Sequence, residues 1–256
     1  MTDESTPLFG HDRVARGYAT ARPWFHPEVA SRIGQRLGRH RPEHALDVGC
    51  GTGLSTTPLS AIARRVTGVD GAADMVAAAS PVAGVSYLVS SAEDLPFADA
   101  SFGLITACGA INWIDRDRFL PEVRRLLPAG GILVIYDGGD LAAMVGDERL
   151  SDWHRDVFRQ RLPRPPRDER LLPDDEARQY GLALETTHDY TLEWTFSLDS
   201  YVAFLMTQSS VTDFVERRGK PADTLRKWLQ VELAPLFEGE ERQLLFGGYI
   251  WYLRRL

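Results

Sequence analysis

The sequence has only two cysteines, Cys50 and Cys108, among its 256 residues. Two thiols cannot build a disulfide framework and lack the spacing of a metal site, so we expect free thiols and no bound metal. No apolar run approaches the ~18 residues that a membrane helix needs. The start, MTDESTPLFG, is acidic and polar, unlike a secretory signal. We therefore expect a reduced, cytoplasmic setting without a membrane.

A surplus of basic residues is also missing. The 29 Lys and Arg residues are outnumbered by 36 Asp and Glu residues, which gives a net charge of −7. Nucleic-acid binding favours the opposite balance, because the phosphate backbone attracts cations, so we expect no nucleic-acid partner. The apolar content of 44% and the charged content of 25% are ordinary for a globular protein. The length favours one domain, residues 1–256.

Short β-rich runs alternate with helical stretches between residues 45 and 136. The runs are nearly continuous in Val, Ile and Leu, which is typical of strands buried on both faces. The stretches between them are long enough to cross over as helices. The pattern predicts an α/β fold, a mostly parallel sheet with helices on both faces. The predicted strands are 45–48, 66–70, 85–89, 102–108 and 132–136, and the predicted helices are 54–65, 72–80 and 116–127.

The regular alternation of strands and helices ends after Tyr136. Prolines interrupt two helical pieces within 140–181, residues 184–198 alternate like a strand, and 199–235 are helical again. With the five runs above, the strand-like stretch and a final β-rich run predict a seven-stranded sheet with helical insertions. The predicted segments are N-terminal helices (1–40), a core (41–139), helical insertions (140–182 and 199–243) and the last two strands (183–198 and 244–256).

The stretch LDVGCGTG, residues 46–53, follows the first predicted strand and is rich in glycine. Glycines that join a strand to a helix allow the close backbone approach of a nucleotide. A dinucleotide fold needs the pattern G-x-G-x-x-G, and in that register the third glycine is replaced by Leu54. Asp47 precedes the loop, and its carboxylate would repel a pyrophosphate and attract a positive charge. The loop therefore favours a positively charged cofactor.

Two further polar signals follow the next two strands. Asp70 lies 19 residues after Gly51, a spacing that suits a carboxylate on the hydroxyls of a ribose. Residues 91–93 follow the third strand and can lie along the edge of an adenine. The three signals come at the carboxyl ends of successive strands, which is where an open α/β sheet binds its ligands.

Together these motifs resemble the class I S-adenosylmethionine-dependent methyltransferases. LDVGCGTG matches their glycine motif, GVDGAADMV their ribose motif, and AEDLPFADASFGLITACGAINWID their adenine and fourth-strand motifs. The resemblance covers residues 45–136, and GGYIWYLRRL is similar to the family's antiparallel last strand. It implies a Rossmann-like fold in which residues 1–40 cover the cofactor, residues 41–139 form the cofactor-binding core, and the insertions 140–182 and 199–243 form a helical cap over the acceptor. The segment YATARPWFHPE resembles a small-molecule subgroup that includes trans-aconitate methyltransferase-like enzymes.

The resemblance implies S-adenosylmethionine as cofactor, S-adenosylhomocysteine as product, and a set of site residues. Arg22 would reach the cofactor's carboxylate, with Tyr18 beside it. The subgroup often has glutamine and histidine near Gly109 and Asn112, in the segment that faces the methyl group, so the acceptor is not carried over. It also often has aspartate at Ser91, a difference that concerns only cofactor binding. The cofactor-binding candidates are Tyr18, Arg22, Asp47, Gly49, Cys50, Gly51, Gly53, Asp70, Gly71, Met75, Ser91, Ala92, Glu93 and Cys108, and the pocket candidates are Asn112, Trp113, Tyr201 and Gln208.

These residues predict methyl transfer to an O, N or C nucleophile of a small molecule, such as a secondary metabolite. Tyr201 and Gln208 share a helix face that either lines a lid or packs in the core. Four side chains are open as a general base, namely Tyr18, His26, Asp115 and Asp137. Two alternatives stay open: a protein that uses the same cofactor without methyl transfer, as a pericyclic or cyclisation catalyst, and an NAD-dependent oxidoreductase.

Overall fold

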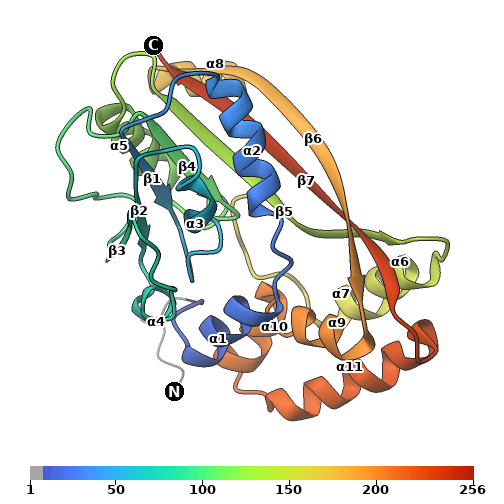
Figure 1. The fold of residues 1–256 in the computed structure, drawn as a ribbon. Coiled ribbons are helices and arrows are strands. Elements are labelled where there is room, and N and C mark those ends of the chain that lie inside the picture. Colours follow the sequence, from blue (N-terminus) through green and yellow to red (C-terminus); the bar gives the residue numbers. More distant parts are fainter. Residues whose placement is uncertain (1–7) are drawn as a thin grey trace. The chain divides into compact units, whose positions relative to one another are not determined.

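A computed structural model describes residues 8–256, apart from the side chains of residues 139–142. Within these residues, seven strands form one sheet in the order β3-β2-β1-β4-β5-β7-β6 (Figure 1). β1 to β5 pair in parallel, as the alternation of strands and helices predicts. The strands are β1 (His44–Val48), β2 (Arg65–Asp70), β3 (Val85–Val89), β4 (Leu104–Cys108), β5 (Ile132–Met144), β6 (Leu182–Phe196) and β7 (Arg242–Arg255).

β7 runs antiparallel to β5. The amide of Gly130 donates to the carbonyl of Arg255 at 3.0 Å, and the amide of Arg255 donates to the carbonyl of Gly131 at 2.9 Å. These bonds place the end of β7 beside the start of β5, which only an antiparallel pair can do. The predicted Rossmann-like fold with an antiparallel last strand is confirmed.

Helices cover both faces of the parallel strands. Phe119 and Leu120 of α5 pack with Ile135 of β5 in one buried cluster. The next residue, Tyr136, points to the opposite face and contacts His26 at the start of α2. The helices of this half of the chain are α1 (Asp12–Ala21), α2 (His26–Leu37), α3 (Thr56–Leu59), α4 (Ala73–Ala77) and α5 (Arg116–Leu126).

The second half of the chain contains five short helices, the 16-residue α11 and two π-helical turns. π-helices are rare and appear mostly as single turns. The helices are α6 (Arg149–Trp153), α7 (Arg159–Arg161), α8 (Asp174–Gln179), α9 (Leu198–Leu205), α10 (Ser209–Thr212) and α11 (Ala222–Phe237), and the π-helices are His154–Phe158 and Asp213–Arg217.

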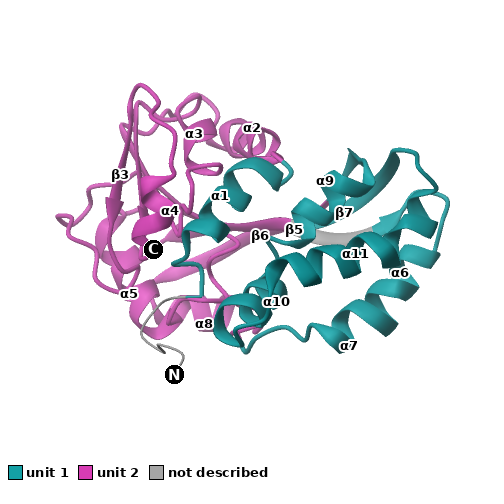
Figure 2. Cartoon of the chain, turned by 90° about the horizontal axis from the view of Figure 1, so that it is seen from below, with its two compact units in different colours: residues 1–23, 139–166, 191–247 teal, residues 24–138, 167–190, 248–256 magenta. Residues whose placement is uncertain are grey.

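The chain divides into two compact units (Figure 2). Unit 1 contains residues 8–23, 139–166 and 191–247, and unit 2 contains residues 24–138, 167–190 and 248–256. Residues 167–190 join unit 2 through contacts with its strands and helices. The hydroxyl of Tyr190 donates to the carbonyl of Asp137 at 2.9 Å, and Asp168 pairs with the buried Arg116 at 3.4 Å.

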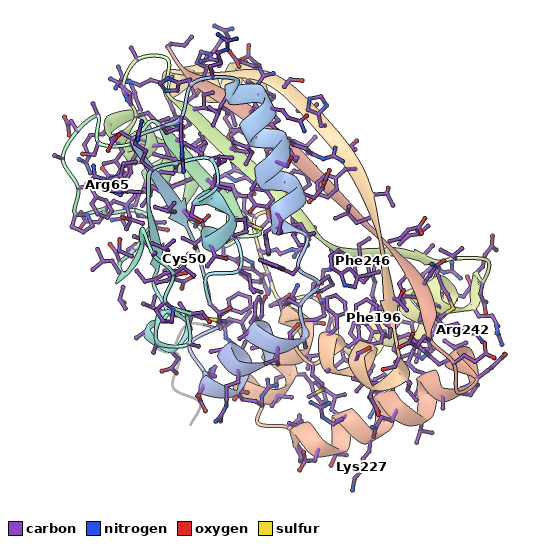
Figure 3. All side chains as sticks on the ribbon, viewed as in Figure 1. Cys50, Arg65, Phe196, Lys227, Arg242 and Phe246 are labelled. Atoms are coloured by element: carbon purple, nitrogen blue, oxygen red, sulfur yellow. The ribbon has the colours of Figure 1, made fainter. Side chains whose placement is uncertain are left out.

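Each unit has its own hydrophobic core. In unit 2 the core lies between α5 and the strands, with Val48 of β1 and Leu133 of β5 fully buried. In unit 1 the core is aromatic, and Phe196 and Phe246 lie with their ring centroids 5.7 Å apart (Figure 3). Tyr201 belongs to this second core and has no exposed surface. Core packing was one of the two interpretations left open for it.

Several predicted elements have different lengths in the structure: the helix predicted for 72–80 spans only Ala73–Ala77, and two others differ more. The helix predicted for 54–65 is helical only at Thr56–Leu59, and turns follow it. Side-chain hydroxyls in this segment form hydrogen bonds that compete with a longer helix. Thr56 donates to Asp47, and Ser60 donates to the carbonyl of Thr57. Conversely, β5 continues to Met144 rather than ending at 136, because β7 lies beside it as a pairing partner.

Candidate functional site

The glycine loop joins β1 to α3 and has a left-handed backbone at three points. Gly49, Gly51 and Gly53 have φ angles of 68°, 53° and 84°, a region that L-residues with a side chain rarely adopt. A Cβ on Gly49 would lie 2.4 Å from the Cβ of Ala110. At Gly51 nothing lies within 4 Å of that position, so the backbone there is open to a ligand.

Asp47 lies beneath the loop, with no exposed surface. Its carboxylate accepts hydrogen bonds from the hydroxyls of Ser55 at 2.6 Å, Thr56 at 2.7 Å and Thr106 at 2.7 Å. Burial raises the pKa of Asp47, and these three hydrogen bonds oppose the rise. The carboxylate therefore ties β1 to α3 and β4. The sequence predicted that it attracts a charged ligand, whereas the structure gives it partners inside the protein.

Asp70 connects the end of β2 to the glycine loop. One carboxylate oxygen accepts from the amide of Gly51 at 2.8 Å, and the other accepts from the amide of Ala72 at 2.8 Å. Burial raises its pKa, and the two amides act to lower it. Two other predicted cofactor-binding residues come soon after Asp70 in the sequence: Gly71 is exposed, whereas Met75 of α4 is buried. The structure thus brings the first two predicted motifs together.

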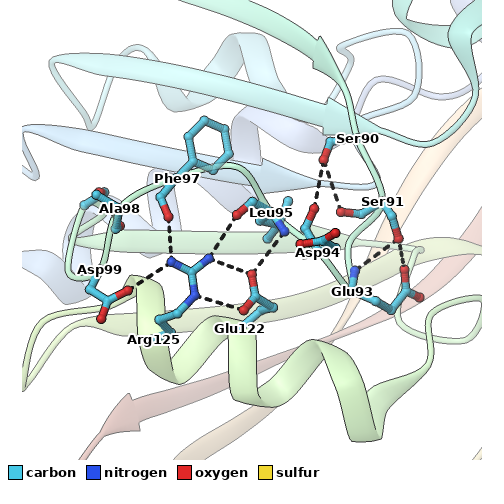
Figure 4. Close-up of polar contacts among 11 residues, drawn as sticks. Ser90, Ser91, Glu93, Asp94, Leu95, Phe97, Ala98, Asp99, Glu122 and Arg125 are labelled. Carbon is cyan, nitrogen blue, oxygen red and sulfur yellow. Dashed lines mark hydrogen bonds and ion pairs between the residues drawn. The ribbon is translucent and has the colours of Figure 1, made fainter.

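The segment after β3 is held in place by α5 (Figure 4). Ser91 donates its hydroxyl to the carboxylate of Glu93, which also accepts from the amide of Asp115 at 3.0 Å. Although burial acts to raise the pKa of Glu93, these hydrogen bonds lower it overall. Ala92 packs partly buried against the core of unit 2. Glu93 is therefore tied to the start of α5.

Two residues of α5 that the motifs did not point to hold the next part of this segment (Figure 4). Arg125 donates to the carbonyl of Leu95 at 2.9 Å and to that of Phe97 at 2.5 Å. Glu122 accepts from the amide of Leu95 at 3.0 Å and pairs with Arg125 at 2.7 Å. Their roles depend on backbone groups distant in sequence, so no local pattern could have indicated them.

The two cysteines are free thiols, as predicted: Cys50 follows β1, and Cys108 is the last residue of the neighbouring strand β4. Burial raises the pKa of Cys50. Cys108 lies with its sulfur 3.7 Å from Nδ1 of His26, and the same nitrogen lies 3.3 Å from the hydroxyl of Tyr136. Beyond β4, Asn112 and Trp113 are half-buried. The carbonyl of Asn112 accepts from the amide of Asp168 at 3.0 Å.

Four predicted site residues lie in unit 1. Arg22 donates to the hydroxyl of Tyr18 at 2.8 Å and to the carbonyl of Thr207 at 3.0 Å, and its guanidinium lies 4.3 Å from the centroid of the Tyr18 ring. Tyr201 is fully buried, and Gln208 is half-buried where α10 begins. The roles that the sequence assigned to these four residues toward cofactor and acceptor stay predictions.

Trp24 was not singled out by the sequence motifs, and it lies at the glycine loop. Its indole nitrogen donates to the carbonyl of Leu54 at 3.3 Å, although 53% of the residue is exposed. A large apolar side chain held beside a ligand loop and left exposed is a candidate contact for the ligand. The sequence signal was its position in YATARPWFHPE.

Comparison with known proteins identifies the family. A family description of a methyltransferase domain matches residues 46–135. An uncharacterized methyltransferase of Mycobacterium tuberculosis is 30% identical over 220 residues, 83% of this chain and 82% of that protein. The O-methyltransferase cnsE of Penicillium expansum is 35% identical over 156 residues, about half of each chain. A solved structure from Anaeromyxobacter dehalogenans, assigned as a type II methyltransferase, has a TM-score of 0.67 at 25% identity and covers 90% of this chain and 95% of its own.

The chain therefore belongs to the methyltransferase family and is an enzyme that uses S-adenosylmethionine. This confirms the class I resemblance and the predicted cofactor. Among residues 8–256, no helix has the length and hydropathy that crossing a membrane would require. The same residues contain no group of three or more His, Cys, Asp or Glu side chains arranged to hold a metal ion.

Alanine at two positions of the glycine loop is expected to have different effects. Gly51→Ala should lower the free energy of unfolding by only ~1–2 kcal/mol, the cost of a left-handed residue, but weaken S-adenosylhomocysteine binding more than tenfold. Gly49→Ala should be less stable than Gly51→Ala, because its Cβ would also collide with Ala110. Urea unfolding and calorimetric binding separate the two effects. Normal binding by Gly51→Ala would show that the ligand does not approach there.

Proposed function

We propose that this enzyme transfers the methyl group of S-adenosylmethionine to an oxygen nucleophile on a small molecule. The main support is the hydrogen bond at 2.8 Å from the backbone amide of Gly51 to the carboxylate of Asp70. It brings the predicted ribose motif directly beside the predicted glycine motif. The oxygen acceptor is supported by the name of the Penicillium expansum relative, an O-methyltransferase. The small-molecule class is supported by the acidic net charge of −7, which disfavours a nucleic-acid substrate.

The residues of unit 2 fit this cofactor better than a dinucleotide. Gly51 leaves its backbone open, and the half-buried carboxylate of Asp70 lies at the loop, where a pyrophosphate would need positive charge. Each carboxylate oxygen of Asp70 accepts one backbone amide and keeps a second lone pair, so both can accept a ribose hydroxyl. Glu93 and the segment after β3 would bind at the adenine.

When bound, the cofactor supplies an electrophilic methyl group on a positively charged sulfur. The chain's own part is to place the acceptor in line with that methyl at ~3 Å, which accounts for much of the rate enhancement in such displacements. Excluding water helps further, because the positive charge disappears during the transfer. We assign the glycine loop and Asp70 to cofactor binding, and the segment after β4, which contains Asn112 and Trp113, to the acceptor side.

The proposal is tested with methyl-labelled S-adenosylmethionine and a small-molecule extract of the source cells, read by mass spectrometry. We expect a new labelled product of low mass with the unaltered enzyme and at least tenfold less with Asp70→Ala at limiting cofactor. Label recovered only in added protein or RNA fractions would contradict the small-molecule acceptor. Tight cofactor binding with no labelled product in any fraction would contradict methyl transfer and favour a catalyst that retains the methyl group.

A further inference from the structure

Asp137 follows Tyr136 at the carboxyl end of the parallel pairing between β4 and β5, where Cys108 pairs with Tyr136. Its backbone position is fixed, because the hydroxyl of Tyr190 donates to its carbonyl at 2.9 Å. Its side chain is half-buried, and one carboxylate oxygen accepts from the amide of Gly138 at 2.7 Å. A carboxylate is thus held at the sheet edge where ligands of α/β folds bind.

Close packing connects the glycine loop to this carboxylate. Gly49 packs so tightly against Ala110 that a Cβ on the glycine would lie 2.4 Å from the alanine Cβ. The preceding residue, Gly109, has a left-handed backbone, and a Cβ there would lie 3.8–3.9 Å from the carboxyl carbon and both oxygens of Asp137. Asp70 is the last residue of β2, on the other side of β1. Asp137 therefore lies on the side of the loop opposite the ribose carboxylate.

The other candidate bases have different surroundings. Asp115 is exposed and caps α5 by accepting the amide of Asp117 at 3.1 Å. His26 is 7% exposed and directs Nδ1 toward Tyr136 inside the unit. Tyr18 lies in unit 1, where Arg22 donates to its hydroxyl. Among these four candidates, Asp137 is the half-buried carboxylate beside the segment after β4.

The tyrosines near Asp137 are poor proton acceptors. Burial raises the pKa of Tyr190 and of Tyr249, and the charge of Asp137 adds to the rise at both. Their phenols therefore stay protonated at neutral pH and can donate hydrogen bonds. The hydroxyl of Tyr190 donates to the backbone carbonyl of Asp137.

We propose that Asp137 accepts the proton of the acceptor's hydroxyl group during methyl transfer. A bond forms between the acceptor oxygen and the methyl carbon while the sulfur–methyl bond breaks and its electron pair stays on sulfur, which becomes neutral. The hydroxyl proton passes to the Asp137 carboxylate and from there to water, so charge and atoms balance. This inference rests on the proposed function and names the acceptor as a protonated hydroxyl compound.

The test compares Asp137→Asn with the unaltered enzyme, in the same labelled extract and at saturating cofactor. We expect the rate of labelled-product formation to fall at least a hundredfold, the usual contribution of a general base, with S-adenosylhomocysteine affinity within twofold. Asparagine keeps an oxygen for the Gly138 amide, so the fold should persist. Asp74→Asn, which changes an exposed carboxylate on α4, is the matched control and should transfer label normally.

The possible outcomes separate this inference from the proposed function. Product formation by Asp137→Asn within threefold of the unaltered enzyme would overturn the role of Asp137 alone. A parallel loss of cofactor affinity would overturn it too, since it would make Asp137 a cofactor ligand. If the unaltered enzyme forms no labelled product, the proposed function fails and the inference with it. If Asp137→Asn does not fold, the same rates of labelled-product formation are measured for Asp137→Ser. Its serine hydroxyl can still accept from the Gly138 amide.

Discussion

Asp70→Ala is expected to weaken S-adenosylhomocysteine binding at least tenfold. The carboxylate would bind two ribose hydroxyls, and hydrogen bonds to a charged group contribute ~1.5–3 kcal/mol. The structure adds a second reason, because the variant also removes the acceptor of the Gly51 amide and so loosens the loop. Isothermal titration of the product into the purified protein measures the change.

Asp74→Ala is the control for this prediction. Asp74 is exposed on α4, four residues from Asp70 in sequence, and it carries the same charge. If the loss came from the general charge of this region, both variants would bind more weakly. We expect the control to bind normally. An Asp70→Ala protein with unchanged affinity would remove the ribose role from that residue.

Asp47→Ala should produce the largest loss of stability among these variants, about 3 kcal/mol or more in the free energy of unfolding. The substitution leaves the hydroxyls of Ser55, Thr56 and Thr106 without their shared acceptor, and each is buried. Unsatisfied buried polar groups cost ~1–3 kcal/mol each, although a hydroxyl can rotate toward another partner. Urea unfolding measures the loss, and Asp47→Asn should lose less because it keeps one oxygen.

The pH dependence of this effect has a defined sign. Burial raises the folded-state pKa of Asp47 above its ordinary value of 3.8. The folded protein then binds more protons than the unfolded chain between the two pKa values. The contribution of this carboxyl to stability is therefore fully present below pH 3.8 and declines as the pH rises through the folded-state pKa. The stability of Asp47→Asn relative to the unaltered protein should improve over that rise, and a constant difference would refute the assigned direction.

Much of the sheet, and the meeting of the glycine loop with Asp70, could be predicted because the evidence is local. Strands that are buried on both faces have nearly continuous apolar sequences, and β1 to β5 lie at those runs in the structure. Gly51 comes shortly after β1 and Asp70 ends β2, and parallel strands end at one edge of the sheet. Their hydrogen bond at 2.8 Å is the direct consequence of that geometry.

The extent of several elements could not be predicted, because it depends on partners distant in sequence. Thr56 donates to Asp47 rather than supporting a longer α3, and nothing in residues 54–65 shows that bond. β5 continues through glycine beyond Tyr136 because β7, more than 100 residues later, lies next to it. Arg125 gained its role from the carbonyls of Leu95 and Phe97 in the same way.

The sequence by itself determined the fold class, the cofactor and the strand ends at which the site is built, because apolar periodicity and glycine-acid motifs act through neighbouring residues. Only the tertiary structure decided what each carboxylate does. Asp47 and Asp70 are both acidic residues at strand ends, yet one is buried under three hydroxyls and the other is half-buried at the open backbone of Gly51. Burial and hydrogen-bond partners come from packing, and packing is set by residues that a local motif does not contain.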